Sequence, residues 1–408
     1  MRYISCVFLF LAFFLFSTKL QAKDCVVDIF FQKNIQFNSH SLDIEESELN
    51  RSNNLKTMLP DVSIGLGQYI NNNKRFSPFT ESNFHLSLSH NLLSGYTAKK
   101  QNDKLEVSSH LKYIDLHSNR YDYIINLFSE IVSYRIKESQ IKLMNERYKK
   151  LHKEYEVAKY QFSLGTVSLF DVEIRYSTLQ KIKADIESLE EEKFFLIEKI
   201  SKEYNIPEDI IPNITYNQLK ECKTIDFQTL LTESNKSKIK SIDIDDDIRN
   251  ISRLPSLYVS FGLTPKKGGA LSNISLKEMN YSASLGISFP LMGLFNSSEN
   301  QRIKAISLSR TRNELLKDSI KLELLQKEIF QKLSTLKKNL AIVKNELSLK
   351  GKEVEYIKNK QDNVIDYLSV VEKLYETENE FKKIEYEIEY YSLYHYFLLQ
   401  CNSCKGYM

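Results

Sequence analysis

Four short segments of the chain alternate apolar residues with small polar ones at the two-residue period of a β-strand. In the first segment Val62, Ile64 and Leu66 stand between serine and glycine residues. A sheet built this way has one apolar and one small polar face, so it fits either a boundary between lipid and a water-filled lumen or a soluble sandwich. The predicted strands cover about residues 61–71, 83–93, 256–264 and 280–290.

Long stretches without glycine or proline follow each pair of strands and predict long helices. In the first half of the chain they cover residues 96–164 and 166–206. Over residues 169–189 the apolar positions recur three and four apart, which marks one buried stripe along a helix. We expect helices over about residues 97–206 and about residues 299–400, packed side by side at shallow angles as in coiled coils.

The second half of the chain repeats the first at an offset of about 197 residues. The Leu-Pro pair at residues 59–60 returns at residues 254–255, and Phe170 falls on Tyr367. Each repeat carries two strands and two long helices, and four strands are too few to close a sheet on itself. We therefore expect the working form to be an oligomer. The sequence divides into a first structural repeat at residues 23–219 and a second at residues 220–408.

The first 22 residues have the three regions of a secretory signal peptide. Arg2 precedes an apolar run over residues 7–16, and small and polar residues lead to an expected cleavage after Ala22. An uncleaved anchor is the alternative, but about ten apolar residues span only about half of a bilayer core. Cys25 follows Lys23 and Asp24 rather than small apolar residues, which argues against an acylated cysteine.

Charge and motifs exclude several classes of function. The chain holds 56 basic and 53 acidic residues, and the two signs alternate along the helical parts, so no nucleic-acid partner is expected. No nucleophile elbow, HExxH string or glycine-rich phosphate loop appears. We therefore expect neither an enzyme nor a bound cofactor.

Four cysteines remain after cleavage of the signal peptide, and in an oxidising compartment an even number favours disulfides. Four cysteines allow three pairings, and the sequence does not choose among them. One pairing joins the repeat-equivalent Cys25 and Cys222 and leaves Cys401 and Cys404 as a small terminal loop. A metal site made from the same four would have an unusual spacing without a nearby histidine.

One short turn separates the two long helices of the first repeat. Gly165 is placed to take a positive φ that ends the first helix, and either Thr166 or Ser168 can cap the next. Asp171 would then complement the dipole of that next helix. Capping alone explains these residue types.

Several segments in this order resemble the TolC-like outer-membrane efflux proteins, also called outer membrane factors. The segment AKYQFSLGTVSLFDVEIRYSTLQKIKADIESLEEEKFFL, residues 158–196, is similar to the helix–turn–helix tip of that family. Gly165, Ser168, Asp171 and Val172 occupy its characteristic positions. LPSLYVSFGL and YSASLGISFPLMGLF look like its barrel strands and the exit from them. The similarity covers most of the chain after residue 22.

The resemblance implies an α+β membrane protein that works as a homotrimer. Four strands from each protomer would form one twelve-stranded β-barrel among the lipids of the outer membrane of a Gram-negative bacterium. The long helices would continue it as an α-helical barrel across the periplasm. Such a channel-tunnel passively exports small molecules or polypeptides in a tripartite efflux or type I secretion system.

The partners implied are a periplasmic adaptor protein and an inner-membrane pump of the RND or ABC type. The adaptor would meet the helical tip, for which the candidate contact residues are Phe162, Leu164, Gly165, Thr166, Val167, Ser168 and Leu169.

The gate is the part of the resemblance that departs from the family. Asp362 stands at the position of Gly165, and Leu368 stands where the first repeat has Asp171. The gate candidates are Asp171, Asp362 and Asp366, and the alternative is that these aspartates only cap and solvate helix starts.

Two alternative functions use the same long helices without forming a pore. One is an exported coiled-coil structural protein with a small β-domain, and the other is a periplasmic adaptor. The first predicts a chain that is soluble without detergent. An adaptor has one helical hairpin in one copy, whereas this chain has two full copies of strands and helices.

Overall fold

The structure is a computed structural model, and it describes residues 25–68, 82–91, 93–222, 225–265, 279–289, 297–360 and 364–399. The predicted signal peptide, Asp362, Cys401, Cys404 and most of the residues between the paired strands lie outside these residues. The chain divides into two compact units. Unit 1 comprises Met1–Asn38, His117–Thr229 and Ile320–Met408, and unit 2 comprises Ser39–Leu116 and Leu230–Ser319.

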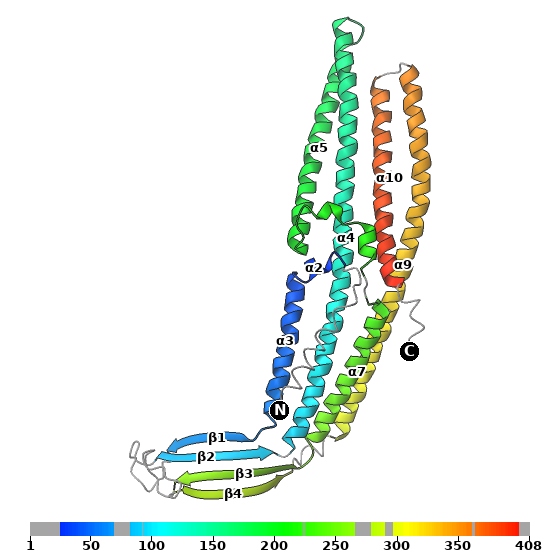
Figure 1. The fold of residues 1–408 in the computed structure, drawn as a ribbon. Coiled ribbons are helices and arrows are strands. Elements are labelled where there is room, and N and C mark those ends of the chain that lie inside the picture. The colour runs from blue at the N-terminus through cyan, green and yellow to red at the C-terminus, as the bar shows by residue number, and fades with distance from the viewer. Residues whose placement is uncertain are drawn as a thin grey trace, which may run out of the picture. The chain divides into compact units, whose positions relative to one another are not determined.

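Unit 2 contains one antiparallel sheet whose four strands lie in sequence order (Figure 1). The strands are β1 (Asp61–Gln68), β2 (Ser82–Asn91), β3 (Ser256–Pro265) and β4 (Met279–Ser288). All four strands predicted from the alternating pattern are present, with ends that differ by a few residues. Because the order is β1-β2-β3-β4, β1 and β4 are the edge strands of this sheet.

The register keeps the two kinds of residue on separate faces. One row of paired positions crosses all four strands as Val62, Leu88, Phe261 and Ala283. The next row crosses them as Ser63, Ser87, Gly262 and Ser282. On this second face serine hydroxyls pair across strands, with 2.5 Å between the Oγ atoms of Ser63 and Ser87.

Unit 2 also contains two helices that the sequence analysis did not predict: α3 (Ile35–Lys56) and α7 (Phe227–Ile251). Each precedes a pair of strands. In α7 the buried residues recur every seven positions, at Leu230, Ser237, Ile244 and Ile251. That spacing is visible in the sequence and is the signal that could have identified this helix.

Hydrogen bonds and ion pairs join the helices of unit 2 into a row. Asn54 of α3 donates to the carbonyl oxygen of Ala98 in α4 (Ser94–Ser163) at 2.8 Å. Lys100 of α4 pairs with Asp247 of α7 at 2.7 Å. Lys304 of α9 (Ser297–Lys360) pairs with the acidic run of α7 through Asp243 at 3.0 Å and Asp246 at 3.1 Å. The order α3-α4-α7-α9 therefore matches the order of the strands.

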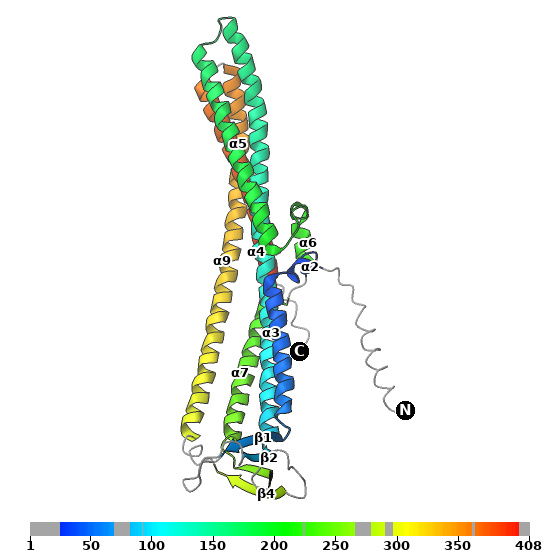
Figure 2. The same ribbon diagram turned by 90° about the vertical axis from the view of Figure 1, so that its left-hand side faces the viewer.

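Unit 1 contains two helical hairpins. The later part of α4 pairs with α5 (Leu169–Tyr204), and the later part of α9 pairs with α10 (Val364–Leu399) (Figures 1 and 2). Heptad packing is clear between α9 and α10, where Leu336 and Val343 pack with Ile384. The short elements α2 (Asp28–Phe31), η1 (Ile211–Asn213) and α6 (Tyr216–Lys220) complete the unit.

A disulfide connects the start of the described chain to the end of α6. Cys25 and Cys222 are joined with 4.7 Å between their Cα atoms, and both are buried. This is one of the three pairings that the sequence allowed. Next to it Arg120 of α4 holds Asp28 through two hydrogen bonds, at 2.7 and 3.0 Å. The disulfide thus links the starts of the two repeats covalently within unit 1.

Replacing both Cys25 and Cys222 by serine is expected to lower the free energy of unfolding by about 2–5 kcal/mol, because the cross-link closes a long loop and restricts the unfolded chain. Thermal unfolding followed by circular dichroism measures the change. Reductant should lower the Tm of the unmodified chain and have much less effect on the serine variant. Equal sensitivity of the two proteins to reductant would contradict this role.

Candidate functional site

The turn between α4 and α5 closes the first helical hairpin with a Schellman motif. The amide of Thr166 donates to the carbonyl oxygen of Gln161 at 3.0 Å, and the amide of Gly165 donates to that of Phe162 at 2.9 Å. Gly165 has φ 75°, in the left-handed region where a side chain adds strain. The backbone carbonyls at the end of α4 are therefore satisfied within the turn.

Ser168 caps α5, and Thr166 does not. The Oγ of Ser168 accepts from the amide of Asp171 at 3.2 Å and donates to its carboxylate at 2.7 Å. The hydroxyl of Thr166 instead donates to the carbonyl oxygen of Gln161 at 2.9 Å. Asp171 is therefore engaged in the cap, whereas Asp366 lies exposed in the first turn of α10.

The surface of this turn is apolar and open to solvent. Leu164 is 60% exposed and Phe170 is 61% exposed. Phe162 and Leu169 are also exposed, while Val167 is half-buried. A cluster of exposed large apolar side chains at the end of a hairpin is typical of a contact surface for another molecule. Phe170 belongs to this surface, although the sequence analysis did not include it.

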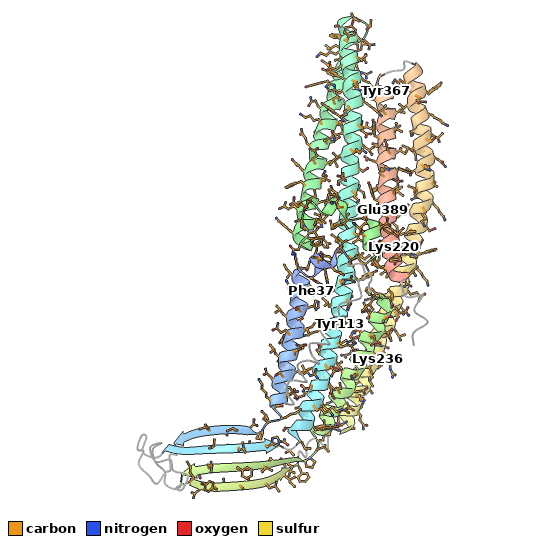
Figure 3. All side chains as sticks on the ribbon, viewed as in Figure 1. Phe37, Tyr113, Lys220, Lys236, Tyr367 and Glu389 are labelled. Atoms are coloured by element: carbon orange, nitrogen blue, oxygen red, sulfur yellow. A yellow bond between two sulfur atoms is a disulfide. The ribbon has the colours of Figure 1, made fainter. Side chains whose placement is uncertain are left out.

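A partly buried polar link connects α10 to the first hairpin, and the sequence analysis missed it. It starts from Tyr367, which is labelled near the beginning of α10 in Figure 3. The hydroxyl of Tyr367 donates to Glu154 of α4 at 2.7 Å, and Arg175 of α5 donates to the other oxygen of that carboxylate at 3.3 Å. Burial, followed by the hydrogen bond to Glu154, raises the pKa of Tyr367 well above its usual value. The hydroxyl is therefore a proton donor at physiological pH.

A second link joins α10 to α4. Arg147 of α4 is 6% exposed, and its guanidinium lies 3.6 Å from Glu372 and 5.7 Å from the ring centroid of Tyr375. Leu368, which the repeat places opposite Asp171, packs against the apolar cluster around Leu151. The two polar links, together with the apolar contact of Leu368, hold α10 against the α4–α5 hairpin.

The apolar face of the sheet is the largest uncovered feature of unit 2. Val62, Phe261 and Ile287 are exposed on it, and Leu285 is 71% exposed. The edges of β1 and β4 have no neighbouring strand among the described residues. A two-edged sheet with an exposed apolar face is incomplete as it stands, because both the backbone groups of the edges and the apolar face need partners.

None of the helices within the described residues is sufficiently long and apolar to span a membrane. The same residues contain no group of three or more histidine, cysteine, aspartate or glutamate side chains positioned to hold a metal ion.

Solved structures with the same arrangement of helices and strands are outer-membrane channels. The chain matches the outer-membrane channel OprN with a TM-score of 0.70 at 12% identity, over 93% of this chain and 90% of that one. It matches the Campylobacter jejuni CmeC outer membrane channel with a TM-score of 0.72 at 13% identity, over 91% and 84%. For the Vibrio cholerae outer membrane protein VceC the TM-score is 0.70 at 8% identity, over 93% and 97%.

The chain has the fold of an outer-membrane channel. The match runs over nearly the whole length of both partners, so it includes the sheet and the long helices together. This is the fold that the sequence resemblance implied. No protein-family model and no curated protein sequence matches the chain.

Replacing Gly165 by alanine is expected to destabilise the turn by about 1–2 kcal/mol, because a Cβ disfavours the left-handed conformation. A Cβ here would meet no heavy atom within 4 Å, so the cost lies in the backbone alone. Hydrogen exchange of the Gly165 and Thr166 amides should become faster. Gly165→Asn is the matched control, because asparagine tolerates this conformation, and it should exchange more slowly than the alanine variant. Equal rates in all three proteins would show that the turn tolerates ordinary dihedral angles.

Proposed function

We propose that the protein is the outer-membrane channel of an export system and that it works as a homotrimer. The observation that carries the proposal is the four-stranded sheet of unit 2, which has an exposed apolar face and two open edges. A second copy of the chain supplies what each edge lacks, since β1 of one copy can pair with β4 of the next. Three copies then close twelve strands into a barrel without edges.

The two faces of the sheet suit the two sides of such a barrel. The apolar face, with Val62, Phe261 and Leu285, would lie against the lipids of the outer membrane. The opposite face, with serine and glycine residues, would line an aqueous lumen. A soluble sandwich would instead need a second layer over the apolar face, and Leu285 is 71% exposed.

The helices of unit 2 have open edges on the same sides as the sheet. At one end of the row of helices, Leu42 and Leu49 are exposed on α3. At the other end, Ile303 and Ile306 are exposed on α9. These two apolar stripes would meet between neighbouring copies and extend the closed wall into the periplasm. Such a ring is heterologous and closes when the rotation between copies is threefold.

The exposed apolar turn between α4 and α5 would receive a periplasmic adaptor protein, and the adaptor would connect the channel to an inner-membrane pump of the RND or ABC type. The contact residues are those of the turn from Phe162 to Leu169, together with Phe170. Export through the channel is passive in this scheme, and the pump supplies the energy. The cargo is a small molecule or a polypeptide.

The polar links between α10 and the first hairpin would hold the channel closed. Opening requires α10 to move relative to α4 and α5, so Tyr367 must release Glu154. Asp366, in the first turn of α10, remains a gate candidate, as does Asp362, which lies outside the described residues. Asp171 is less suited to gating than they are, because the cap of α5 uses its carboxylate.

The first test separates a lipid-facing barrel strand from a sheet in water. Leu285→Lys places a charge on the apolar face of β4, and Ser284→Lys places the same charge one residue away on the polar face. A charge facing lipid near the bilayer midplane costs about 2–4 kcal/mol. We expect Ser284→Lys to be purified as a detergent-requiring trimer that conducts ions in a planar bilayer, as the unmodified chain should, and Leu285→Lys to fail to insert.

The outcome against the proposal is an unmodified chain that is a soluble monomer without conductance. That result would favour the exported coiled-coil or adaptor protein. Equal insertion of the two lysine variants would also contradict the assignment of the faces.

The second test addresses the polar links. Tyr367→Phe removes the hydroxyl that bonds Glu154 and keeps the ring. A hydrogen bond to a charged group contributes about 1.5–3 kcal/mol, so the open fraction in single-channel recordings should rise about tenfold or more. Tyr160→Phe, at an exposed position in the last turn of α4, is the control and should leave gating unchanged. An unchanged open fraction in Tyr367→Phe would remove this link from the gate.

A further inference from the structure

Tyr258 lies on the polar face of the sheet, at the end of the strands where the chain enters β1 and β3. The alternation of the strands places it on the same face as Ser260 and Gly262 of β3, and the register places Asn91 of β2 and Gly286 of β4 beside it. The neighbouring positions on this face hold serine, glycine and asparagine residues, and His85 of β2 lies farther along the face. The ring of Tyr258 is the one apolar surface among these neighbouring positions.

The ring of Tyr258 lies directly over Gly286. A Cβ at Gly286 would stand 2.2 Å from both Cζ and Oη of Tyr258, so the ring occupies the space that any side chain there would need. The glycine thus lets the ring lie along the sheet. Tyr258 is nonetheless 42% exposed, so part of the ring remains open to whatever lies above this face.

A carboxylate lies on the same face, near the same end of the strands. Asp61 begins β1, and its row runs through Ser89 and Ser260 to Ser284. Tyr258 occupies the next position of that face along β3. The side chain of Asp61 is exposed. An aromatic face attracts cations through its quadrupole, and a carboxylate nearby adds to that attraction.

We propose that Tyr258 is a specificity-determining residue of the conduit and that it favours organic cations carrying an aromatic ring. The inference rests on the proposed function, because only a channel whose lumen is lined by the polar face brings cargo past this residue. In a trimer three Tyr258 rings and three Asp61 carboxylates would line the lumen where the strands follow the helices. The serines and glycines around them leave the rings as the bulkiest groups at that level.

The probe is benzyltriethylammonium, with tetraethylammonium as the matched cation without a benzyl group. Both are added to single channels in potassium chloride. Benzyltriethylammonium should reduce the current at lower concentration than tetraethylammonium does in the unmodified channel. In Tyr258→Leu the blocking concentration of benzyltriethylammonium should rise about three- to tenfold, as loss of one kind of cation–π contact predicts, and the block by tetraethylammonium should change less.

Two further variants make the test specific. Tyr281→Leu changes a tyrosine on the opposite, apolar face of the same sheet and should leave both blocks unchanged. Gly286→Ala keeps Tyr258 but displaces its ring, and it should weaken the block by benzyltriethylammonium as well.

The possible failures are distinguishable. A chain that neither inserts nor conducts removes the proposed function and this inference with it. If the channel conducts but benzyltriethylammonium blocks Tyr258→Leu and Tyr281→Leu at the same concentration, the role of Tyr258 is overturned and the proposed channel function stands.

Discussion

The structure depends on the backbone hydrogen bonds that a four-stranded sheet leaves unmade at its edges. Strands β2 and β3 are paired on both sides, whereas β1 and β4 each present one open side. In water such edges template aggregation, and in lipid they are too costly to persist. The apolar face adds a second unmet requirement, because large side chains such as Leu285 are exposed on it. Closure with further copies of the chain would pair the open edges, and lipid around the closed sheet would cover the apolar face.

The helices of unit 2 reproduce the order of the strands, and charged groups maintain that order. The acidic run of α7 pairs with Lys100 of α4 on one side and with Lys304 of α9 on the other. Each pair is partly exposed and contributes modestly to stability. Their contribution to the order of the helices is more important. Because α7 offers carboxylates to a lysine of α4 on one side and to a lysine of α9 on the other, a different order of helices would leave these charges unpaired. The row α3-α4-α7-α9 therefore ends in two open apolar stripes above two open strand edges.

Unit 1 combines a part that is tied covalently and a part that is held by polar contacts. The disulfide between Cys25 and Cys222 ties the starts of the two repeats together, and the ion pair between Arg120 and Asp28 fixes the first of them to α4. Farther along the same helices, α10 is held by hydrogen bonds and ion pairs around Glu154 and Arg147. These are the contacts that the proposed opening would break.

The sequence by itself determined the local elements and the duplication. Alternation at Val62 and its neighbours predicted the strands, and the absence of glycine and proline predicted α4 and α5, because both signals depend on short-range periodicity. Gly165 was identified for the same reason, since a positive φ is a local requirement. The helices α3 and α7 were missed, although the seven-residue spacing of Leu230, Ser237, Ile244 and Ile251 in α7 was visible in the sequence.

Only the tertiary structure decided which distant residues meet. Cys25 has three possible partners in the sequence, and the fold selects Cys222 because it brings the starts of the two repeats together. Tyr367 was visible only as the counterpart of Phe170, and its hydroxyl acquires a role when α10 packs beside Glu154. Tyr258 gains its meaning from Gly286, which the register places beside it. Such contacts are set by packing between segments far apart in the chain, and no local period encodes them.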